Sequence, residues 1–159
     1  MIEKNVALVN RFYESFKELN YKAMNNCYSN DIAFFDPVFG LLQGNEVKYM
    51  WEMLCKNAKD FTLTYGNIKE LDAEYYTCDW EATYNFSKTG RKVVNKVIAH
   101  MKMLDGEIVE HSDGFSLHNW SKQAIGFSGW LLGWNSYYQQ KIKNNAKRNL
   151  INFIEKHYQ

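Results

Sequence analysis

Residues 97–117 read VIAHMKMLDGEIVEHSDGFSL, and this segment gives the clearest secondary-structure signal in the chain. Its first half has apolar residues at every second position, the pattern of a β-strand with one covered face. These residues are Val97, Ala99, Met101 and Met103. Asp105-Gly106 then favours a two-residue hairpin turn. A second, antiparallel strand is therefore expected to follow.

This second strand carries two polar residues on its apolar side. The residues of that side are Val109, His111, Asp113, Phe115 and Leu117. Because an unpaired charge inside a protein is costly, a half-covered sheet normally keeps ionisable groups off its buried face. We therefore predict that His111 and Asp113 line a cavity, where one water could bridge them across about 7 Å of strand. A hydrogen-bonded core histidine is the alternative.

Two more strands are expected upstream of this hairpin. Apolar residues alternate with polar ones over positions 61–65 and 80–86, and Ser87–Arg91 predicts the turn that follows. The polar residues of these two strands would form the outer face of the sheet. They are Thr62, Thr64, Glu81, Thr83 and Asn85.

The first sixty residues are predicted to be mainly helical. Apolar residues recur every three or four positions over 2–19 and 45–58, with Asn45 as the expected N-cap of the later helix. A short helix is expected over Tyr21–Tyr28. Ile32–Phe35 predicts a short strand that ends at Asp36-Pro37, because a residue before proline is pushed out of helical geometry.

The last forty residues are also predicted to be helical, with a long final helix from Tyr138 to His157. Residues 121–159 hold six basic side chains and one acidic side chain, so their net charge is +5 and that of the remainder is −4. We interpret the basic tail as a solvated helix face. Contact with a membrane surface or a nucleic acid is the alternative.

The composition fits one compact protein of 159 residues and excludes several classes. A net charge of +1 disfavours a strongly cationic nucleic-acid binder, and no apolar run is long enough to span a membrane. Aromatic residues are frequent, at 16%, and would supply bulky walls. Cys27, Cys55 and Cys78 are odd in number and lack CxxC spacing, which together with the absence of a signal segment predicts reduced thiols and a cytoplasmic location.

The order of elements resembles the nuclear transport factor 2-like superfamily, which includes ketosteroid isomerases, limonene epoxide hydrolases and SnoaL-type polyketide cyclases. The resemblance covers residues 4 to about 118, and its most specific parts are Asn10-Arg11-Phe12-Tyr13 and residues 31–38, DIAFFDPV. It implies an α+β fold, a cone-shaped barrel of a curved, mostly antiparallel sheet wrapped around N-terminal helices, and a homodimer. We expect residues 1–119 to form this cone domain. Residues 120–159 would be a helical extension packed on the same domain.

The resemblance also implies a site. Asp36 aligns with the general-base aspartate of the ketosteroid isomerases, whereas Phe12 and Ala99 stand where those enzymes have their two oxyanion-hole donors. Since losing one such donor costs about 2.7 to 4 kcal/mol, steroid isomerisation by that mechanism is not expected. Asp36, His111 and Asp113 are more similar to the SnoaL-like branch, in which acid/base residues act on a small hydrophobic or polycyclic substrate without a metal or organic cofactor.

Six further residues are predicted to line or floor the cone as ligand contacts: Tyr13, Trp51, Trp80, Tyr84, Asn95 and Met101. Each also has a structural alternative, because aromatic side chains fill ordinary cores and asparagine pairs readily with backbone. Asp36 could likewise be a simple turn former before Pro37. No metal site is expected, since His100 and His118 lie on the opposite face or at the strand end.

Three functional hypotheses follow. The first is an acid/base isomerase, cyclase or epoxide hydrolase in which Asp36, His111 and Asp113 transfer protons on a small hydrophobic carbonyl or epoxide compound. The second is a pocket that binds a ligand without converting it. The third is a dimerisation module that uses the outer sheet face, with the basic tail engaging a partner.

Overall fold

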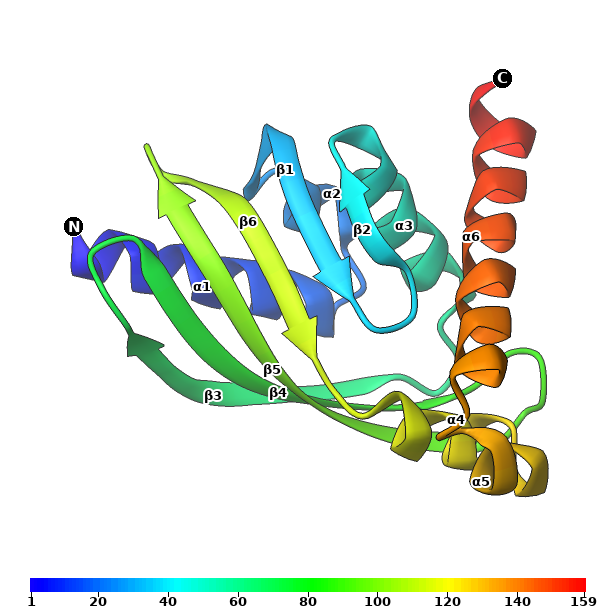
Figure 1. Ribbon diagram of the computed structural model, residues 1–159. Coiled ribbons are helices and arrows are strands. Elements are labelled where there is room, and N and C mark those ends of the chain that lie inside the picture. Colours follow the sequence, from blue (N-terminus) through cyan, green and yellow to red (C-terminus); the bar gives the residue numbers. More distant parts are fainter.

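The computed structural model describes residues 1–159 and contains six helices and six strands (Figure 1). Their order along the chain is α1 (Ile2–Lys17), α2 (Tyr21–Asn25), β1 (Tyr28–Asp36), β2 (Gly40–Gln43), α3 (Asn45–Asn57), β3 (Thr62–Glu70), β4 (Tyr75–Asn85), β5 (Lys92–Leu104), β6 (Glu107–Gly114), α4 (Leu117–Ala124), α5 (Phe127–Leu132) and α6 (Ser136–Tyr158).

The six strands form one curved sheet that does not close into a barrel. Their order in space is β2-β1-β6-β5-β4-β3, and every neighbouring pair is antiparallel except β1 and β6, which run parallel. Helices α1 and α3 lie across the concave side, and α6 stands at one end of the sheet (Figure 1). The predicted α+β fold, with a curved, mostly antiparallel sheet around N-terminal helices, is confirmed.

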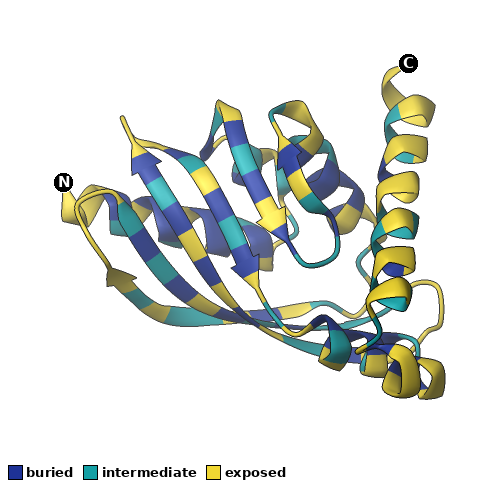
Figure 2. Cartoon of the chain, viewed as in Figure 1, coloured by how far each residue is buried: buried dark blue, intermediate teal, exposed yellow.

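Burial alternates along the central strands as predicted (Figure 2). In β5, Val97, Ala99, Met101 and Met103 are buried, whereas Lys96, Ile98 and His100 are exposed. The buried residues face α1 and α3 and join a hydrophobic cluster that runs through the concave side. Removal of this apolar surface from water is the main stabilising term of the fold.

Strand β6 differs from the sequence prediction near its start and at its end. Lys102 pairs with Glu110 while Met103 pairs with Ile108, so Val109 is an extra residue in a β-bulge. As a result Ile108 is fully buried and Val109 only partly, the reverse of the predicted faces. The strand also ends at Gly114, and Leu117, predicted to belong to it, begins α4.

Three predictions for the N-terminal part were wrong in detail. The second helix stops at Asn25, and Tyr28 begins β1, which is longer than the predicted Ile32–Phe35. The N-cap of α3 is Gly44, with a φ of 57°, and Asn45 is the first helical residue. Strand β2, which pairs with β1, was not predicted.

The long final helix is confirmed and packs against the rest of the chain at several places along its length. Leu150 is buried in the main hydrophobic cluster. Near the C-terminus, the rings of Tyr158 and Tyr49 lie 4.4 Å apart, and the hydroxyl of Tyr158 donates to Glu52. None of the helices is long and apolar enough to span a bilayer. The three thiols are buried and unpaired, as the cysteine spacing predicts.

Candidate active site

A cavity of about 850 Å³ lies in the structure, and it is lined by residues of β1, β4, β5, β6, α1, α3, α4 and α6. This volume is within the range of sites that hold small organic molecules. Six of the nine predicted site residues line it: Asp36, Trp51, Trp80, Tyr84, Asn95 and Asp113. Hydrophobic side chains dominate the lining, so a carboxylate in this wall has few polar neighbours.

Asp36 is the last residue of β1. It forms the turn before Pro37 and also lines the cavity, so both sequence interpretations apply to it. Its Oδ1 accepts the backbone N–H groups of Val38 at 2.9 Å and Phe39 at 2.6 Å, which is an Asx-type turn. The side chain is nevertheless buried, at 8% exposure, and lines the cavity. Its second oxygen, Oδ2, has no protein partner and remains available.

Burial raises the pKa of Asp36 to about 7, from an ordinary value of 3.8. The negative charge of Asp113 pushes this pKa further up. The N–H groups of Phe39 and Val38 lower the pKa in part. A carboxyl group with this pKa exists in both protonation states near neutral pH, which suits a group that accepts and returns a proton.

Asp113 lies beside Asp36 because β1 and β6 are parallel neighbours. Phe34 pairs with His111 and Phe35 with Ser112, so the next step of this register brings the two carboxyl groups to the same end of the two strands. Because two neighbouring negative charges repel each other, ionisation of both carboxyl groups is disfavoured. The charge of Asp113 raises the pKa of Asp36 for this reason.

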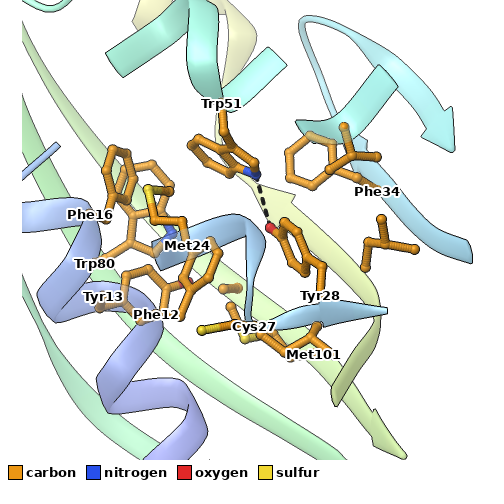
Figure 3. Packing of buried hydrophobic residues seen from close by; sticks show 14 of the residues in the cluster. Phe12, Tyr13, Phe16, Met24, Cys27, Tyr28, Phe34, Trp51, Trp80 and Met101 are labelled. Carbon is orange, nitrogen blue, oxygen red and sulfur yellow. Dashed lines mark hydrogen bonds between the residues drawn. The ribbon is translucent and has the colours of Figure 1, made fainter. Parts of the chain in front are cut away.

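His111 sits behind this wall in a hydrogen-bonded chain of buried side chains. The indole N–H of Trp51 donates to the hydroxyl oxygen of Tyr28 at 2.9 Å (Figure 3). The Tyr28 hydroxyl lies 2.7 Å from Nδ1 of His111, and Nε2 of His111 lies 2.9 Å from Oδ1 of Asp113. The indole N–H of Trp80 also donates to that Asp113 oxygen, at 3.2 Å.

One proton arrangement satisfies every member of this chain. Since Asp113 has only acceptors, Nε2 of His111 carries a proton and donates it. Nδ1 then accepts the Tyr28 proton, and Tyr28 in turn accepts from Trp51. We therefore assign a neutral His111 protonated at Nε2. The bond to Asp113 is direct, so the predicted bridging water is not needed.

Asp113 thus has one occupied and one open oxygen. Its Oδ1 accepts two N–H groups, from His111 and Trp80, while Oδ2 has no partner and Asp113 lines the cavity. The buried chain orients the carboxylate and leaves one oxygen for a ligand.

Tyr84 supplies the hydroxyl group of the cavity wall. Its oxygen accepts the indole N–H of Trp120 at 2.9 Å, and no protein group accepts its proton. Burial raises the pKa of Tyr84, and the charge of the nearby Asp36 raises it further, so the phenol is neutral and a donor at physiological pH.

Two predicted ligand contacts lie in the core instead of the lining. Tyr13 is fully buried, stacks on Tyr65 with ring centroids 5.2 Å apart, and its hydroxyl has no hydrogen-bond partner. Met101 is buried between neighbouring strands, paired with Tyr76 and His111.

Sequence reasoning did not find two features of the site. Tyr28 was assigned to a helix, and nothing local marks it as the partner of a residue 83 positions away. The second feature is a row of amides on α6 that lines the cavity: Asn145, Asn149 and Asn152. Their spacing of four and three residues places them on one helix face, a signal that was available in the sequence.

Ten of the 34 lining residues follow position 119, so the C-terminal helices complete the cavity. No group of three or more His, Cys, Asp or Glu side chains is arranged to hold a metal ion.

The sequence model of the SnoaL-like domain family matches residues 9–111. That range includes Asp36 and His111 and ends before Asp113 and the C-terminal helices. No curated protein matches the chain.

Several solved structures share the fold at low sequence identity. A hypothetical protein with a ketosteroid isomerase-like fold from Catenulispora acidiphila, in complex with trimethylamine, has a TM-score of 0.65 and 13% identity over 74% of this chain and 92% of that chain. A putative polyketide cyclase from Xanthomonas campestris has a TM-score of 0.63 and 16% identity over 76% and 96%. AclR, a putative hydroxylase from Streptomyces galilaeus, has a TM-score of 0.61 and 18% identity over 74% and 91%. These similarities establish the architecture.

Proposed function

Because this chain belongs to the SnoaL-like domain family, we propose that it binds a small hydrophobic molecule in the cavity and transfers a proton on it through Asp36. The observation that carries the proposal is a buried carboxyl group in an apolar cavity wall, with a pKa of about 7 and an oxygen without a protein partner.

The proposed reaction begins with removal of a proton from a carbon next to a carbonyl group. Oδ2 of Asp36 accepts this proton, and Oδ1 stays bonded to Val38 and Phe39, so the carboxyl group keeps its orientation. Return of the proton to another carbon would give an isomerisation, and attack of the enolate on a second carbonyl of the substrate would give a cyclisation. A base with a pKa near the working pH contributes about 10²- to 10⁴-fold to such a step.

An enolate needs a hydrogen-bond donor for its oxygen, and we assign this role to Tyr84. Phe12 and Ala99, which stand at the donor positions of ketosteroid isomerases, have no side-chain donor. Tyr84 lines the same cavity as Asp36 and has a free proton. Its phenol would donate to the developing negative charge as an oxyanion hole does.

Asp113 and His111 have different parts in this proposal. Asp113 would contact the substrate with its open oxygen and favour the protonated state of Asp36 through its charge. His111 is a positioning residue, because it is enclosed and acts through Asp113.

The residues of the cavity wall also favour a particular class of ligand. Trp51, Trp80 and Asn95 of the sequence prediction would form part of the wall, and the α6 amides would bind neutral oxygen groups at its rim. A flat hydrophobic carbonyl compound with hydroxyl or carbonyl substituents fits both surfaces. Among the structural neighbours, one is described as a putative polyketide cyclase and another as co-crystallised with polyporic acid.

The test uses 2-tetralone, a bicyclic ketone with acidic C–H groups, as the probe. The protein is incubated with it in D₂O, and loss of the C–H proton signals is followed by NMR. We expect exchange above the buffer rate, and a loss of about a hundredfold in Asp36→Asn. Tyr84→Phe should lose about tenfold or more.

Asp31→Asn is the matched control, since Asp31 is an exposed carboxylate on the same strand. It should exchange at the wild-type rate. Exchange that persists unchanged in Asp36→Asn would contradict the proposed base.

A ligand-binding protein without catalysis is the second candidate, and the replacement of both oxyanion-hole donors by Phe12 and Ala99 favours it. In that case 2-tetralone or a hydroxylated relative would quench the tryptophan fluorescence of the cavity wall without any isotope exchange. The two measurements together separate the candidates.

We also propose that two copies pair through the outer face of the sheet. Phe35 of β1 and Leu41 of β2 are paired neighbours on this face and are 49% and 59% exposed, and Ile98 of β5 is 52% exposed. Sedimentation equilibrium should give the mass of a dimer, and Phe35→Lys with Ile98→Lys should give a monomer. A monomeric wild type would contradict this arrangement.

A further inference from the structure

The short helix α5 and its flanks present large apolar side chains to solvent. Six of them lie within eleven residues and are between 44% and 81% exposed: Phe127, Trp130, Leu131, Leu132, Trp134 and Tyr137. We call these six residues the α5 patch. Monomeric proteins seldom expose so many neighbouring large apolar residues without a binding role.

Glycine packing explains why this helix faces outward. A side-chain carbon added at Gly129 would lie 2.0 Å from the backbone oxygen of Ser121, and one at Gly133 would lie 2.3 Å from the Ser121 Oγ. Helix α5 therefore packs its glycines tightly on α4. The aromatic and leucine residues of α5 are exposed, on a helix that lies beside α4 at one end of the molecule (Figure 1).

The surroundings of the patch are basic. The turn between β4 and β5 lies against the end of α4, since Thr89 donates to the Ala124 carbonyl and Nε of Arg91 donates to the Gln123 carbonyl at 2.8 Å. The guanidinium of Arg91 is also next to Gly126, where α5 begins. Residues 86–95 and 114–144, which build this end, contain no acidic residue and six basic ones: Lys88, Arg91, Lys92, Lys122, Lys141 and Lys143.

We propose that the α5 patch docks on the surface of an anionic lipid bilayer. Tryptophan and tyrosine favour the boundary between lipid headgroups and chains, and basic residues beside them are attracted to anionic headgroups. The basic tail thus has a role beyond a solvated helix face. Docking is shallow, because the patch consists of one short helix and its flanks.

A second copy of the chain is a less suitable occupant. In a twofold dimer the same patch would meet itself, which would bring the six basic residues of each copy together. Lipid headgroups instead neutralise them.

Vesicle flotation of the protein with residues 1–159 tests the proposal. The vesicles are of phosphatidylcholine alone or with about one third phosphatidylglycerol, at about 0.1 M salt. We expect the wild type to float with the anionic vesicles at least about tenfold more than with the neutral ones. Trp130→Ser with Trp134→Ser should reduce binding at least about tenfold, and Lys122→Glu with Lys141→Glu should reduce binding to the anionic vesicles.

Leu71→Ser with Ile151→Ser is the matched control, since these exposed apolar residues, at 58% and 54%, lie in the turn between β3 and β4 and in the second half of α6. It should float like the wild type. A brominated lipid adds a readout that needs no substitution, since Trp130 and Trp134 should be quenched when the wild type binds. This readout and the lysine variant decide the matter if the tryptophan variant does not fold.

Three results would overturn the proposal. The first is a wild type that stays unbound on anionic vesicles, and the second is equal flotation of the tryptophan variant when circular dichroism shows it folded. The third is an unbound wild-type dimer that the tryptophan variant converts to a monomer, which would assign the patch to a second copy. None of these measurements depends on the cavity or its ligand.

Discussion

The two halves of the concave side differ in what fills them. In the packed half, under α1, aromatic rings surround one another. The ring centroid of Phe12 lies between 5.2 and 5.9 Å from the ring centroids of Tyr13, Tyr28, Trp51 and His111. In the hollow half, between the sheet and α6, comparable residues leave a cavity of about 850 Å³. Strand β6 passes from one half to the other, with His111 in the first and Asp113 in the wall of the second.

This difference assigns separate roles to two residues that the sequence treats alike. His111 has a partner on each ring nitrogen and acts as a structural group. Asp113 keeps one oxygen open. The hydrogen-bonded chain of the packed half thus orients the carboxyl group of Asp113 and leaves its second oxygen open for a ligand.

The largest effect is expected from breaking the packed half at His111. His111→Ala would leave the Tyr28 hydroxyl proton without an acceptor, remove one of the two donors to Asp113 Oδ1, and open a void among aromatic rings. We expect a loss of about 4 to 5 kcal/mol in the free energy of unfolding, measured by urea denaturation. Ser112→Ala, on the opposite face of β6, should change it by less than about 0.5 kcal/mol. Equal effects of the two substitutions would contradict the contrast between the halves.

A smaller effect is expected from the hollow half, and its sign depends on pH. Because the pKa of Asp36 is raised to about 7 in the fold, the unfolded chain releases this proton first as the pH rises. The protonated form of Asp36 therefore favours the folded state more than the ionised form does. This contribution is complete below about pH 4 and is lost as the pH rises through about 7. Asp36→Asn should be more stable than the wild type at pH 8, by up to about 4 kcal/mol.

The same experiment at acidic pH supplies the control. The asparagine keeps an oxygen that can accept from Val38 and Phe39, so both proteins should unfold with similar free energies at about pH 4. A constant difference across this pH range would show that Asp36 does not titrate as described.

Two matched alanines sharpen the comparison. Ala99 is fully buried in the packed half, whereas Ala146 lines the cavity. Ala99→Leu should cost about 1 to 3 kcal/mol because no space is available, and Ala146→Leu should change stability by less than about 1 kcal/mol. Thermal unfolding of both variants measures this. A large loss in the Ala146 variant would mean that the space beside α6 is filled.

The smallest effect concerns the buried hydroxyl of Tyr13, which has no partner. Removing it in Tyr13→Phe deletes a desolvated polar group without creating a void, so we expect a change between zero and a gain of about 1 kcal/mol. A clear loss of stability in urea denaturation would show that this hydroxyl is hydrogen-bonded in solution.

Local patterns were sufficient to predict most of the fold. Alternating residues such as Val97 to Met103 specify a half-covered strand, and the period of α6 specifies a helix, because both depend only on near neighbours in the sequence. The bulge at Val109 could not be predicted this way. One inserted residue shifts the faces of a strand and leaves no mark in composition.

The site was predicted less completely, for a related reason. Asp36, Asp113 and Tyr84 were found because polar or aromatic residues stand out against a family pattern or an apolar face. The partnership of Tyr28 with His111 depends on how a parallel pair of strands, β1 and β6, is aligned, which involves residues far apart in the chain. Whether a given ring fills the core, like Tyr13, or lines the cavity, like Tyr84, also depends on where the C-terminal helices lie.

The proposed function depends on an aspartate that titrates near neutral pH inside an apolar cavity. Carbon-detected NMR of protein labelled at the aspartate carboxyl carbons gives this pKa directly, with Asp36→Asn to assign the signal. We expect a titration midpoint of about 7 for Asp36. A midpoint near the ordinary value of about 4 would mean that the carboxyl group faces water, and the proposed proton transfer would not stand.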